Sequence, residues 1–227
     1  MQTSNTNASV GFRFRASGGD DTIIGGAGID SIEHSDSATT TVNGRVWEWR
    51  GSSGNDSFLG SAFDESFITQ PGNDTVDGGD GFDRVRYDRF GATGVKVEYS
   101  AQGAAIVTGV WFGSVFTDTL TNIENVRGAN VGVDQFIGSA GSEQFEGRGG
   151  VNLFDGKGGN DLFKASGEAN VFEFALGSGE DTIEGFVAGR DQIIIDPDFG
   201  ITSPAQFISF VSSNGDTIID FNGVDKV

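Results

Sequence analysis

Residues 129–173 read as five consecutive nonapeptides: ANVGVDQFI, GSAGSEQFE, GRGGVNLFD, GKGGNDLFK and ASGEANVFE. Phenylalanine occupies the eighth place of every unit, and an oxygen-bearing side chain stands two places earlier. Glycine fills the fourth place in four of the five units. Neither the helical period of about 3.6 residues nor the two-residue period of a strand generates a period of nine. The pattern therefore predicts very short strands that alternate with tight turns suited to holding a metal ion.

The same nonapeptide occurs twice in residues 16–33 and four times in residues 51–86. Two interruptions, residues 34–50 and 87–128, separate the three blocks. In the first interruption, Asn43-Gly44 stands between alternating residues, which predicts a β-hairpin with a two-residue turn. Its 17 residues are one short of two repeats, so it could instead replace two units of the stack.

The blocks define a domain organisation in which repeats are interrupted and then closed by an end piece. A repeat stack needs such a piece to cover its last hydrophobic layer, and Ser203-Pro204 predicts a short helix there, running to about Val211. We expect a tail and first strand at 1–15, a β-roll block at 16–86 with a hairpin insertion at 34–50, a β insertion at 87–128, a second β-roll block at 129–190 and a C-terminal cap with the character of a secretion segment at 191–227.

Composition points to calcium. The formal net charge of −19 disfavours nucleic acid and acidic membranes as partners, because like charges repel. Carboxylates, amides and backbone carbonyls are hard oxygen ligands, which favour Ca²⁺ over softer metals. The chain has no cysteine, which excludes disulfides and thiolate metal sites. It also has no run of about 18 apolar residues and no recognisable N-terminal signal peptide.

Spacing predicts which side chains would share an ion. If each turn of the coil takes two nonapeptides, repeats n and n+2 lie about 4.8 Å apart, so their ligand residues can share one cation with the glycine carbonyls. The predicted pairs are Asp56 with Asp74, Glu65 with Asp83, Asp134 with Asn152, Glu143 with Asp161, and Asn152 with Asn170. Pairs of carboxylates should bind calcium best and the Asn–Asn pair worst, because ligand charge drives affinity.

The strongest candidates are Asp56, Asp74, Asp83 and Asp161, so the firmest ions are expected in residues 51–86. Sites at Asp21 and Asp30 are expected to be incomplete, because their partners fall in the first interruption, where Thr39 stands in the ligand place. The full set of candidate metal-binding residues is Gly19, Asp21, Gly28, Asp30, Gly54, Asp56, Glu65, Gly72, Asp74, Gly78, Gly81, Asp83, Asp134, Gly141, Glu143, Asn152, Gly156, Gly159, Asp161 and Asp181.

The units GGAGIDSIE, GGDGFDRVR and GKGGNDLFK resemble the glycine- and aspartate-rich repeats of RTX (hemolysin-type calcium-binding) proteins. The resemblance covers residues 16–33, 51–86 and 129–190. TDTLTNIENVRG is similar to segments that lead into such repeat blocks. GEDTIEGFVAGRDQIIID and GDTIIDFNGVDKV resemble the C-terminal part that follows the repeats in proteins of this kind.

The resemblance implies an all-β fold: a right-handed parallel β-roll, or β-solenoid, with β insertions and a C-terminal capping segment. It implies that several Ca²⁺ ions bind and that the chain is unfolded without them. It also implies type I secretion from a Gram-negative bacterium through an uncleaved C-terminal signal, with the secretion machinery as a partner in transit. We expect a monomeric structural and secretion module of an extracellular protein. Since another rung would be expected after Val227, the possibility that the chain is a fragment stays open.

Catalysis by these residues is not expected. There is no H-E-x-x-H motif, His34 is the only histidine, and Gly156-Lys157-Gly158 lacks the Ser or Thr of a phosphate-binding loop. The repeat already accounts for nearly all carboxylate pairs as calcium ligands, so any activity would lie on a part of the parent protein outside this chain.

The alternative function is a module that binds an extracellular polysaccharide or a cell surface through aromatic residues of the interruptions, Trp47, Trp49, Trp111 and Phe112. The two functions differ in what they predict for the three tryptophans. A structural module should bury them, whereas a binding module should expose at least two of them on one face.

Overall fold

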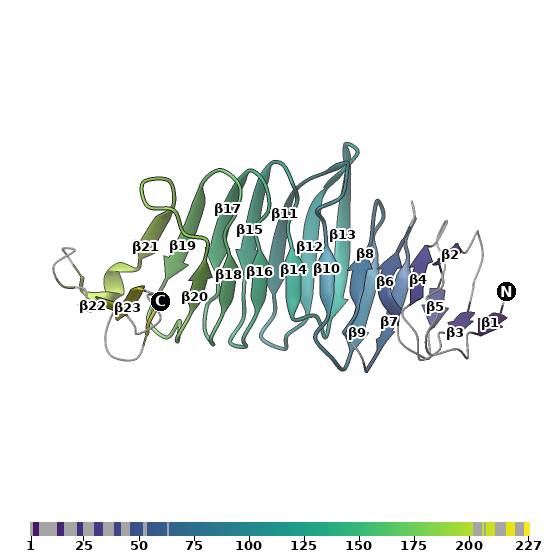
Figure 1. Cartoon of the computed structure of the whole chain (residues 1–227), viewed down its shortest axis with the longest axis horizontal. Coiled ribbons are helices and arrows are strands. Elements are labelled where there is room, and N and C mark those ends of the chain that lie inside the picture. The colour runs from purple at the N-terminus through teal and green to yellow at the C-terminus, as the bar shows by residue number, and fades with distance from the viewer. Residues whose placement is uncertain are drawn as a thin grey trace.

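The computed structural model describes residues 48–51, 54–60, 62, 64–201, 206, 217–220 and 225–227, together with the backbone alone at 2–4, 13–15, 22–24, 30–33, 39–41, 46–47, 61 and 208–211. The chain forms an elongated all-β stack with its two termini at opposite ends (Figure 1). Two sheets face each other along its length, and successive strands alternate between them except in the second interruption and at the two ends. Within the described residues, no helix is long and apolar enough to cross a membrane.

One sheet has nine strands in the described part of the chain and is parallel throughout. Its strands are three to five residues long, which agrees with the very short strands that the nonapeptide pattern predicts. In order across the sheet they are β2 (Arg13–Arg15), β4 (Asp30–Glu33), β6 (Val46–Arg50), β8 (Ser66–Ile68), β10 (Arg84–Arg86), β14 (Asn125–Arg127), β16 (Gln144–Glu146), β18 (Leu162–Lys164) and β20 (Thr182–Glu184).

The facing sheet has ten described strands. In order they are β21 (Gln192–Ile195), β19 (Asn170–Phe174), β17 (Val151–Asp155), β15 (Val133–Ile137), β11 (Ala92–Tyr99), β12 (Ala105–Trp111), β13 (Ser114–Thr121), β9 (Thr75–Gly79), β7 (Ser57–Ser61) and β5 (Thr39–Thr41). Only β12 runs antiparallel to its neighbours. Residues 92–121 of the second interruption are thus strands of this sheet, and the stack passes through them.

Stacked phenylalanines form the core between the sheets. On the ten-stranded side, the rings of Phe136, Phe154 and Phe172 stack with centroids 5.1 and 5.0 Å apart. On the facing side, Phe145 and Phe163 stack at 6.3 Å. These are the eighth-place residues of the five nonapeptides, and all are at most 1 % exposed. The period of nine therefore sets the core, because two units per coil put equivalent side chains in register.

The first interruption does not form the expected hairpin. β5 lies in the ten-stranded sheet beside β7, whereas β6 lies in the nine-stranded sheet between β4 and β8, and all these pairings are parallel. Residues 39–50 thus supply two more rungs, which is the alternative that their length allowed. The placement of Thr39 in the ligand position was also wrong, because Thr39 pairs with Ser57, one residue after Asp56. Asn43-Gly44 lies outside the described residues.

The C-terminal segment contains strands where a helix was expected. Ile208–Val211 form β22, which pairs antiparallel with β23 (Thr217–Asp220), so the helix cannot reach Val211. Ser203 lies outside the described residues, and Gln206 is in a 3-10 conformation. A further 3-10 helix, η1 (Pro197–Phe199), comes before this segment. A two-stranded pair of β1 (Gln2–Ser4) and β3 (Thr22–Ile24) stands at the other end.

Candidate metal centre

Acidic and amide side chains form two rows, each at the turns that lead into one sheet. The residues before strands of the nine-stranded sheet, here the first row, are Glu65, Asp83, Glu124, Glu143, Asp161 and Asp181. The corresponding residues of the ten-stranded sheet, here the second row, are Asp56, Asp74, Asp118, Asp134, Asn152, Asn170 and Asp191. They lie just before or at the start of a strand, except Asp118, which lies inside β13. Every member is buried except Glu124, which is half-buried. A row of buried carboxylates requires compensation by hydrogen bonds or cations.

Within the rows, several carboxylates accept a hydrogen bond from a backbone N–H of the preceding turn. The Asp56 N–H donates to Asp74 Oδ1 at 2.7 Å, and the Glu65 N–H donates to Asp83 Oδ1 at 2.7 Å. The Glu143 N–H likewise donates to Asp161 Oδ1 at 2.8 Å. The structure therefore brings together the first two predicted pairs and the Glu143–Asp161 pair. Their role as calcium ligands stays a prediction.

The other oxygen of these carboxylates is the feature that fits a cation. Four aspartates that are at most 2 % exposed have an Oδ2 atom with no hydrogen-bond partner among the described residues: Asp74, Asp83, Asp134 and Asp161. A buried carboxylate oxygen without a donor is costly, and a bound cation is one of the few groups that relieves that cost. The donor set is entirely oxygen, as Ca²⁺ prefers.

Glycines let backbone carbonyls approach the same place. A Cβ atom on Gly78 would overlap the carbonyl oxygen of Asn122 and lie 2.6 Å from Asp83 Oδ2. A Cβ atom on Gly156 would overlap Asp161 Oδ2. Both glycines therefore hold open the space beside an unpartnered carboxylate oxygen, as a cation site requires.

The remaining predicted glycines of the described chain also lie in or beside the turns: Gly54, Gly72, Gly81, Gly141 and Gly159. Gly19, Asp21 and Gly28 lie outside the described residues. Asp30 is described only by its backbone, which begins β4.

Burial raises the pKa of six carboxyl groups in the two rows. Burial is the largest cause for each, with neighbouring carboxylates adding to it, and it raises the pKa of Asp74 to about 9 and of Asp83 and Asp161 to about 8. The pKa values of Asp118, Asp134 and Asp181 rise to about 7 for the same leading reason. Without a counter-charge, the ionised rows therefore oppose the folded state at neutral pH.

Two members of the rows, Asp118 and Glu124, lie in the second interruption and were missed from the sequence. The Asp74 N–H donates to Asp118 Oδ1 at 2.9 Å, and the Asp83 N–H donates to Glu124 Oε2 at 2.7 Å. Both therefore stand where the next repeat would place a ligand, 44 and 41 residues later in the chain. A signal was present: in each case an acidic residue stands two residues before a buried apolar residue, Leu120 or Val126, as Asp74 stands before Val76.

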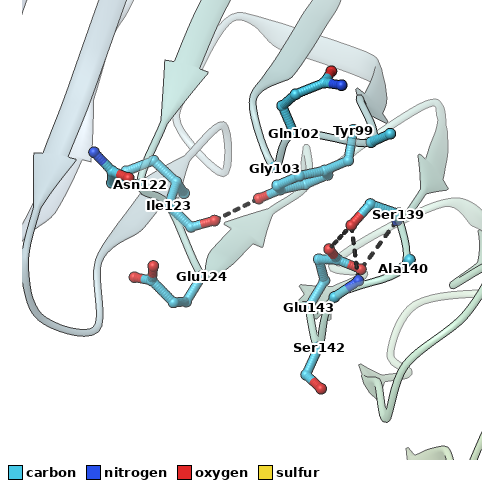
Figure 2. Close-up of a pocket in the computed structure, with 12 residues that line it drawn as sticks. Tyr99, Gln102, Gly103, Asn122, Ile123, Glu124, Ser139, Ala140, Ser142 and Glu143 are labelled. Atoms are coloured by element: carbon cyan, nitrogen blue, oxygen red, sulfur yellow. Dashed lines mark hydrogen bonds between the residues drawn. The ribbon is translucent and has the colours of Figure 1, made fainter.

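The first row is broken between Glu124 and Glu143. Three strands of the ten-stranded sheet separate β9 from β15, but only β14 separates β10 from β16, so the turns spread apart here. The Glu143 carboxylate turns back to accept hydrogen bonds from the N–H and Oγ of Ser139, and the Tyr99 hydroxyl donates to the Ile123 carbonyl (Figure 2). A cavity of about 460 Å³ fills the gap.

The second row loses its charge toward the C-terminal end. Asn152 Nδ2 donates to Asn170 Oδ1 at 2.7 Å, and Asn170 Nδ2 donates to Asp191 Oδ1 at 3.0 Å. Burial alone would raise the pKa of Asp191, but hydrogen bonds from Arg190, the Val187 N–H and Asn170 outweigh it and lower that pKa to about 2. Amides and an arginine thus already compensate this part of the row.

At the C-terminal end, Asp225 extends the first row beyond Asp181. The N–H groups of Gly177 and Gly179 donate to the Asp225 carboxylate at 3.3 and 3.0 Å, and the Asp181 N–H donates to the Lys226 carbonyl. Asp225 is 2 % exposed. The segment 225–227 therefore supplies a further rung of ligand-type residues.

The burial of two tryptophans does not fit the alternative function, in which aromatic residues form an exposed binding face. Trp49 is fully buried and Trp111 is 1 % exposed, so at most one of the three tryptophans can be exposed. The side chain of Trp47 lies outside the described set. Phe112 is 61 % exposed and is the one described member of the predicted aromatic group on the surface.

No group of three or more His, Cys, Asp or Glu side chains with metal-site geometry occurs among the described residues, so each candidate site depends on a carboxylate pair and carbonyls. Comparison with known families finds four copies of the RTX calcium-binding nonapeptide repeat, in residues 13–33, 50–85 and 129–163. No curated protein is significantly similar to the chain.

Proposed function

From the premise that this chain is an RTX repeat protein, a calcium-binding β-roll whose repeats are structural rather than catalytic, we propose that it is a module that folds when Ca²⁺ binds. We further propose that it serves as the structural and secretion domain of an extracellular protein. The observation that carries the proposal is the set of buried, unpartnered carboxylate oxygens of Asp74, Asp83, Asp134 and Asp161.

The residues that would hold the ions are the carboxylates of the two rows, helped by carbonyls such as that of Asn122. When bound, Ca²⁺ supplies the positive charge and the preference for six to eight oxygen ligands that these groups match. The Asp56, Glu65 and Glu143 N–H groups orient the carboxylates, and the phenylalanine stacks exclude water from the space behind them.

By mass action, the folded fraction then depends on the calcium concentration of the compartment. A ligand that binds only the folded chain stabilises it by about 2.7 kcal/mol when its concentration is 100 times the dissociation constant, and several sites add up. At low cytosolic calcium the carboxylates repel one another and the chain stays unfolded, which suits export through a narrow channel. At the millimolar calcium outside a cell the same chain folds.

The experiment is circular dichroism of the chain as calcium is raised to about 10 mM, the upper edge of the range for extracellular sites. We expect a cooperative gain of β-structure that a chelator reverses. Full β-structure in the presence of the chelator at pH 7, or no gain up to that concentration, would contradict the proposal. Magnesium at the same concentration is the control for charge screening, and it should not replace calcium because it dehydrates reluctantly and demands an octahedral site.

A further inference from the structure

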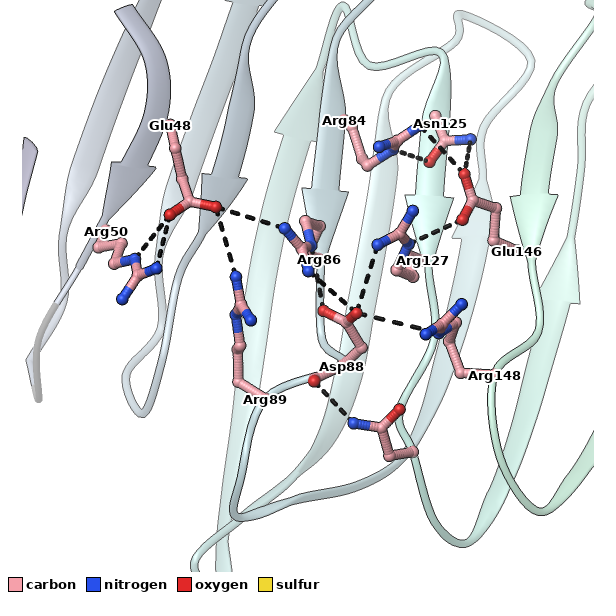
Figure 3. A network of polar contacts seen from close by, with 11 residues as sticks. Glu48, Arg50, Arg84, Arg86, Asp88, Arg89, Asn125, Arg127, Glu146 and Arg148 are labelled. Atoms are coloured by element: carbon pink, nitrogen blue, oxygen red, sulfur yellow. Dashed lines mark hydrogen bonds and ion pairs between the residues drawn. The ribbon is translucent and has the colours of Figure 1, made fainter. Parts of the chain in front are cut away.

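Six arginines gather on the outer face of the nine-stranded sheet and its adjoining turns, together with three carboxylates (Figure 3). This arginine face consists of Arg50, Arg84, Arg86, Arg89, Arg127 and Arg148, with Glu48, Asp88 and Glu146. It holds six of the fourteen basic residues of a chain whose formal net charge is −19. The arginine face is therefore a positive area on an otherwise strongly anionic molecule.

The carboxylates of the arginine face lie underneath and the guanidinium groups lie above them. The side chains of Glu48, Asp88 and Glu146 are only 6–8 % exposed, whereas those of Arg89 and Arg148 are 36 and 43 % exposed. Asp88 Oδ2 contacts three guanidinium groups, at 3.1, 3.4 and 3.9 Å. Among the residues whose side chains are described, these six guanidinium groups share three carboxylates, so positive charge exceeds negative charge on this part of the surface.

The guanidinium groups of the arginine face lie close enough to one another to lower the pKa of some of them. Burial, followed by neighbouring charges that include the positive Arg86, lowers the pKa of Arg89, and burial with the positive Arg127 and Arg86 lowers the pKa of Arg84. The Nε atom of Arg89 is buried and has no hydrogen-bond partner among the described residues. An anion bound at the exposed guanidinium nitrogens would relieve the repulsion.

An aromatic pair stands next to the arginine face. Phe90 follows Arg89 directly and is 89 % exposed, and its ring lies 5.7 Å from that of Phe112 in an edge-to-face contact. Exposed phenylalanine rings are uncommon on a monomer surface and can stack against the apolar face of a sugar. Positive charge and a stacking surface therefore occur side by side.

We propose that the arginine face, with Phe90 and Phe112 at its edge, binds a linear acidic polysaccharide that carries carboxylates or sulfates. Planar guanidinium groups match such anions in bidentate geometry. Arg86 of β10 and Arg127 of β14 are register partners on adjacent strands, about 4.8 Å apart, and Arg50 lies on β6 further along the same sheet, so the positive charges follow one line that a linear polymer can contact. A narrow polymer touches only the arginine face, whereas an anionic bilayer or a nucleic acid duplex would also meet the surrounding negative charge.

The inference requires the folded chain and so rests on the proposed calcium-dependent fold. Circular dichroism first establishes that the calcium-loaded full chain and each variant are folded. Titration calorimetry with a short oligogalacturonate, a sulfated dextran and a neutral dextran then reports binding. Loss of folding would count against the proposed function, whereas a folded chain that binds neither acidic polymer counts against this inference alone.

We expect the oligogalacturonate, the sulfated dextran or both to bind, and the neutral dextran not to bind. Arg89→Gln and Arg148→Gln should each weaken binding roughly three- to fivefold, as the loss of a partly exposed charge contact does. Phe90→Ala should weaken it to a similar extent without changing its dependence on salt concentration. The matched control is Lys96→Gln, which removes one positive charge from an exposed residue of β11 on the other sheet, and it should leave affinity unchanged.

Three results would overturn the inference. One is the absence of binding to both acidic polymers by a folded, calcium-loaded chain. The second is an equal loss of affinity in Lys96→Gln and Arg148→Gln, which would show that the polymer responds to the overall charge of the protein and not to the arginine face. The third is tighter binding to phosphatidylserine vesicles or duplex DNA than to either acidic polymer, since the occupant would then be a different class of molecule.

Discussion

The two rows of the second block, residues 129–173, share one core but differ in chemistry. The first row contains Glu143 and Asp161 and continues to Asp181, and each later carboxylate accepts an N–H from the turn before it. The second row contains Asn152 and Asn170, whose amides bond to each other. The same phenylalanine stacks lie behind both rows. The difference separates the two tasks of the repeat: the eighth-place apolar residue builds the coil, and the sixth-place side chain decides whether that coil needs a cation.

The largest effect that this comparison predicts is a pH dependence of folding in the calcium-free protein. Because burial raises the folded-state pKa of Asp83 and Asp161 to about 8, far above the ordinary value of 3.8, the folded chain binds more protons than the unfolded one. Their stabilisation is present below about pH 4 and is lost as pH rises toward 8, by up to about 1.4 kcal/mol per pH unit for each group. Calcium-free chain should therefore show more β-structure at pH 5 than at pH 8, as measured by circular dichroism.

Saturating calcium should remove or reverse that trend, because the ion binds the deprotonated carboxylates. A calcium-free chain that is equally folded at both pH values would show that the carboxylate rows do not oppose folding. The conclusion that the sixth-place side chain decides whether a coil needs a cation would then be wrong.

The shared core predicts the next largest effect. Phe154 lies between Phe136 and Phe172, so Phe154→Ala should destabilise the calcium-loaded fold by about 3–5 kcal/mol through the cavity it leaves. Denaturant unfolding at saturating calcium measures this change. The matched control is Phe90→Ala, an exposed ring whose removal should cost less than about 0.5 kcal/mol. Equal losses in the two variants would contradict the assignment of the stack as the core.

A charge removal in the first row should have a smaller effect that is specific to calcium. Asp161→Asn keeps the shape but removes a carboxylate between Glu143 and Asp181, so the calcium concentration at half-folding should rise roughly tenfold, or about 1.4 kcal/mol. Calcium titration followed by circular dichroism measures the midpoint. Asp155→Asn, on a half-buried side chain of β17 that pairs with Lys157, is the control and should leave the midpoint nearly unchanged.

The converse change in the second row should have the smallest effect. Asn152→Asp creates a carboxylate pair with Asp134, so the folding midpoint should move to lower calcium by a few-fold. At neutral pH the ionised carboxylate cannot donate to Asn170 Oδ1 as the amide does, so the variant should be less stable than the original when calcium is chelated. An unchanged midpoint would mean that sixth-place charge does not set calcium affinity.

The regular part of this architecture could be predicted from the sequence because one periodic signal specified it. The eighth-place phenylalanines gave the two stacks of the second block with the correct partners, and the spacing of 18 residues brought together Asp56 with Asp74 and Glu65 with Asp83. Both follow from local geometry that repeats, so a single unit contains the information.

The irregular part depends on contacts that no repeat encodes. Asp118 and Glu124 reach the rows only because β11, β12 and β13 enter the ten-stranded sheet out of chain order, with β11 placed beside β15 and β13 beside β9. The hairpin expected at Asn43-Gly44 was wrong because local turn chemistry was weighed above the length of the interruption. Long-range pairing overrode local signals in both interruptions.

Diffraction from crystals grown with calcium, with data collected for the anomalous signal of the ion, tests the central claim most directly. The account predicts anomalous peaks beside the unpartnered oxygens of Asp74, Asp83, Asp134 and Asp161, and no peak between Asn152 and Asn170. Peaks beside the asparagines, or none beside these aspartates in a folded chain, would contradict it.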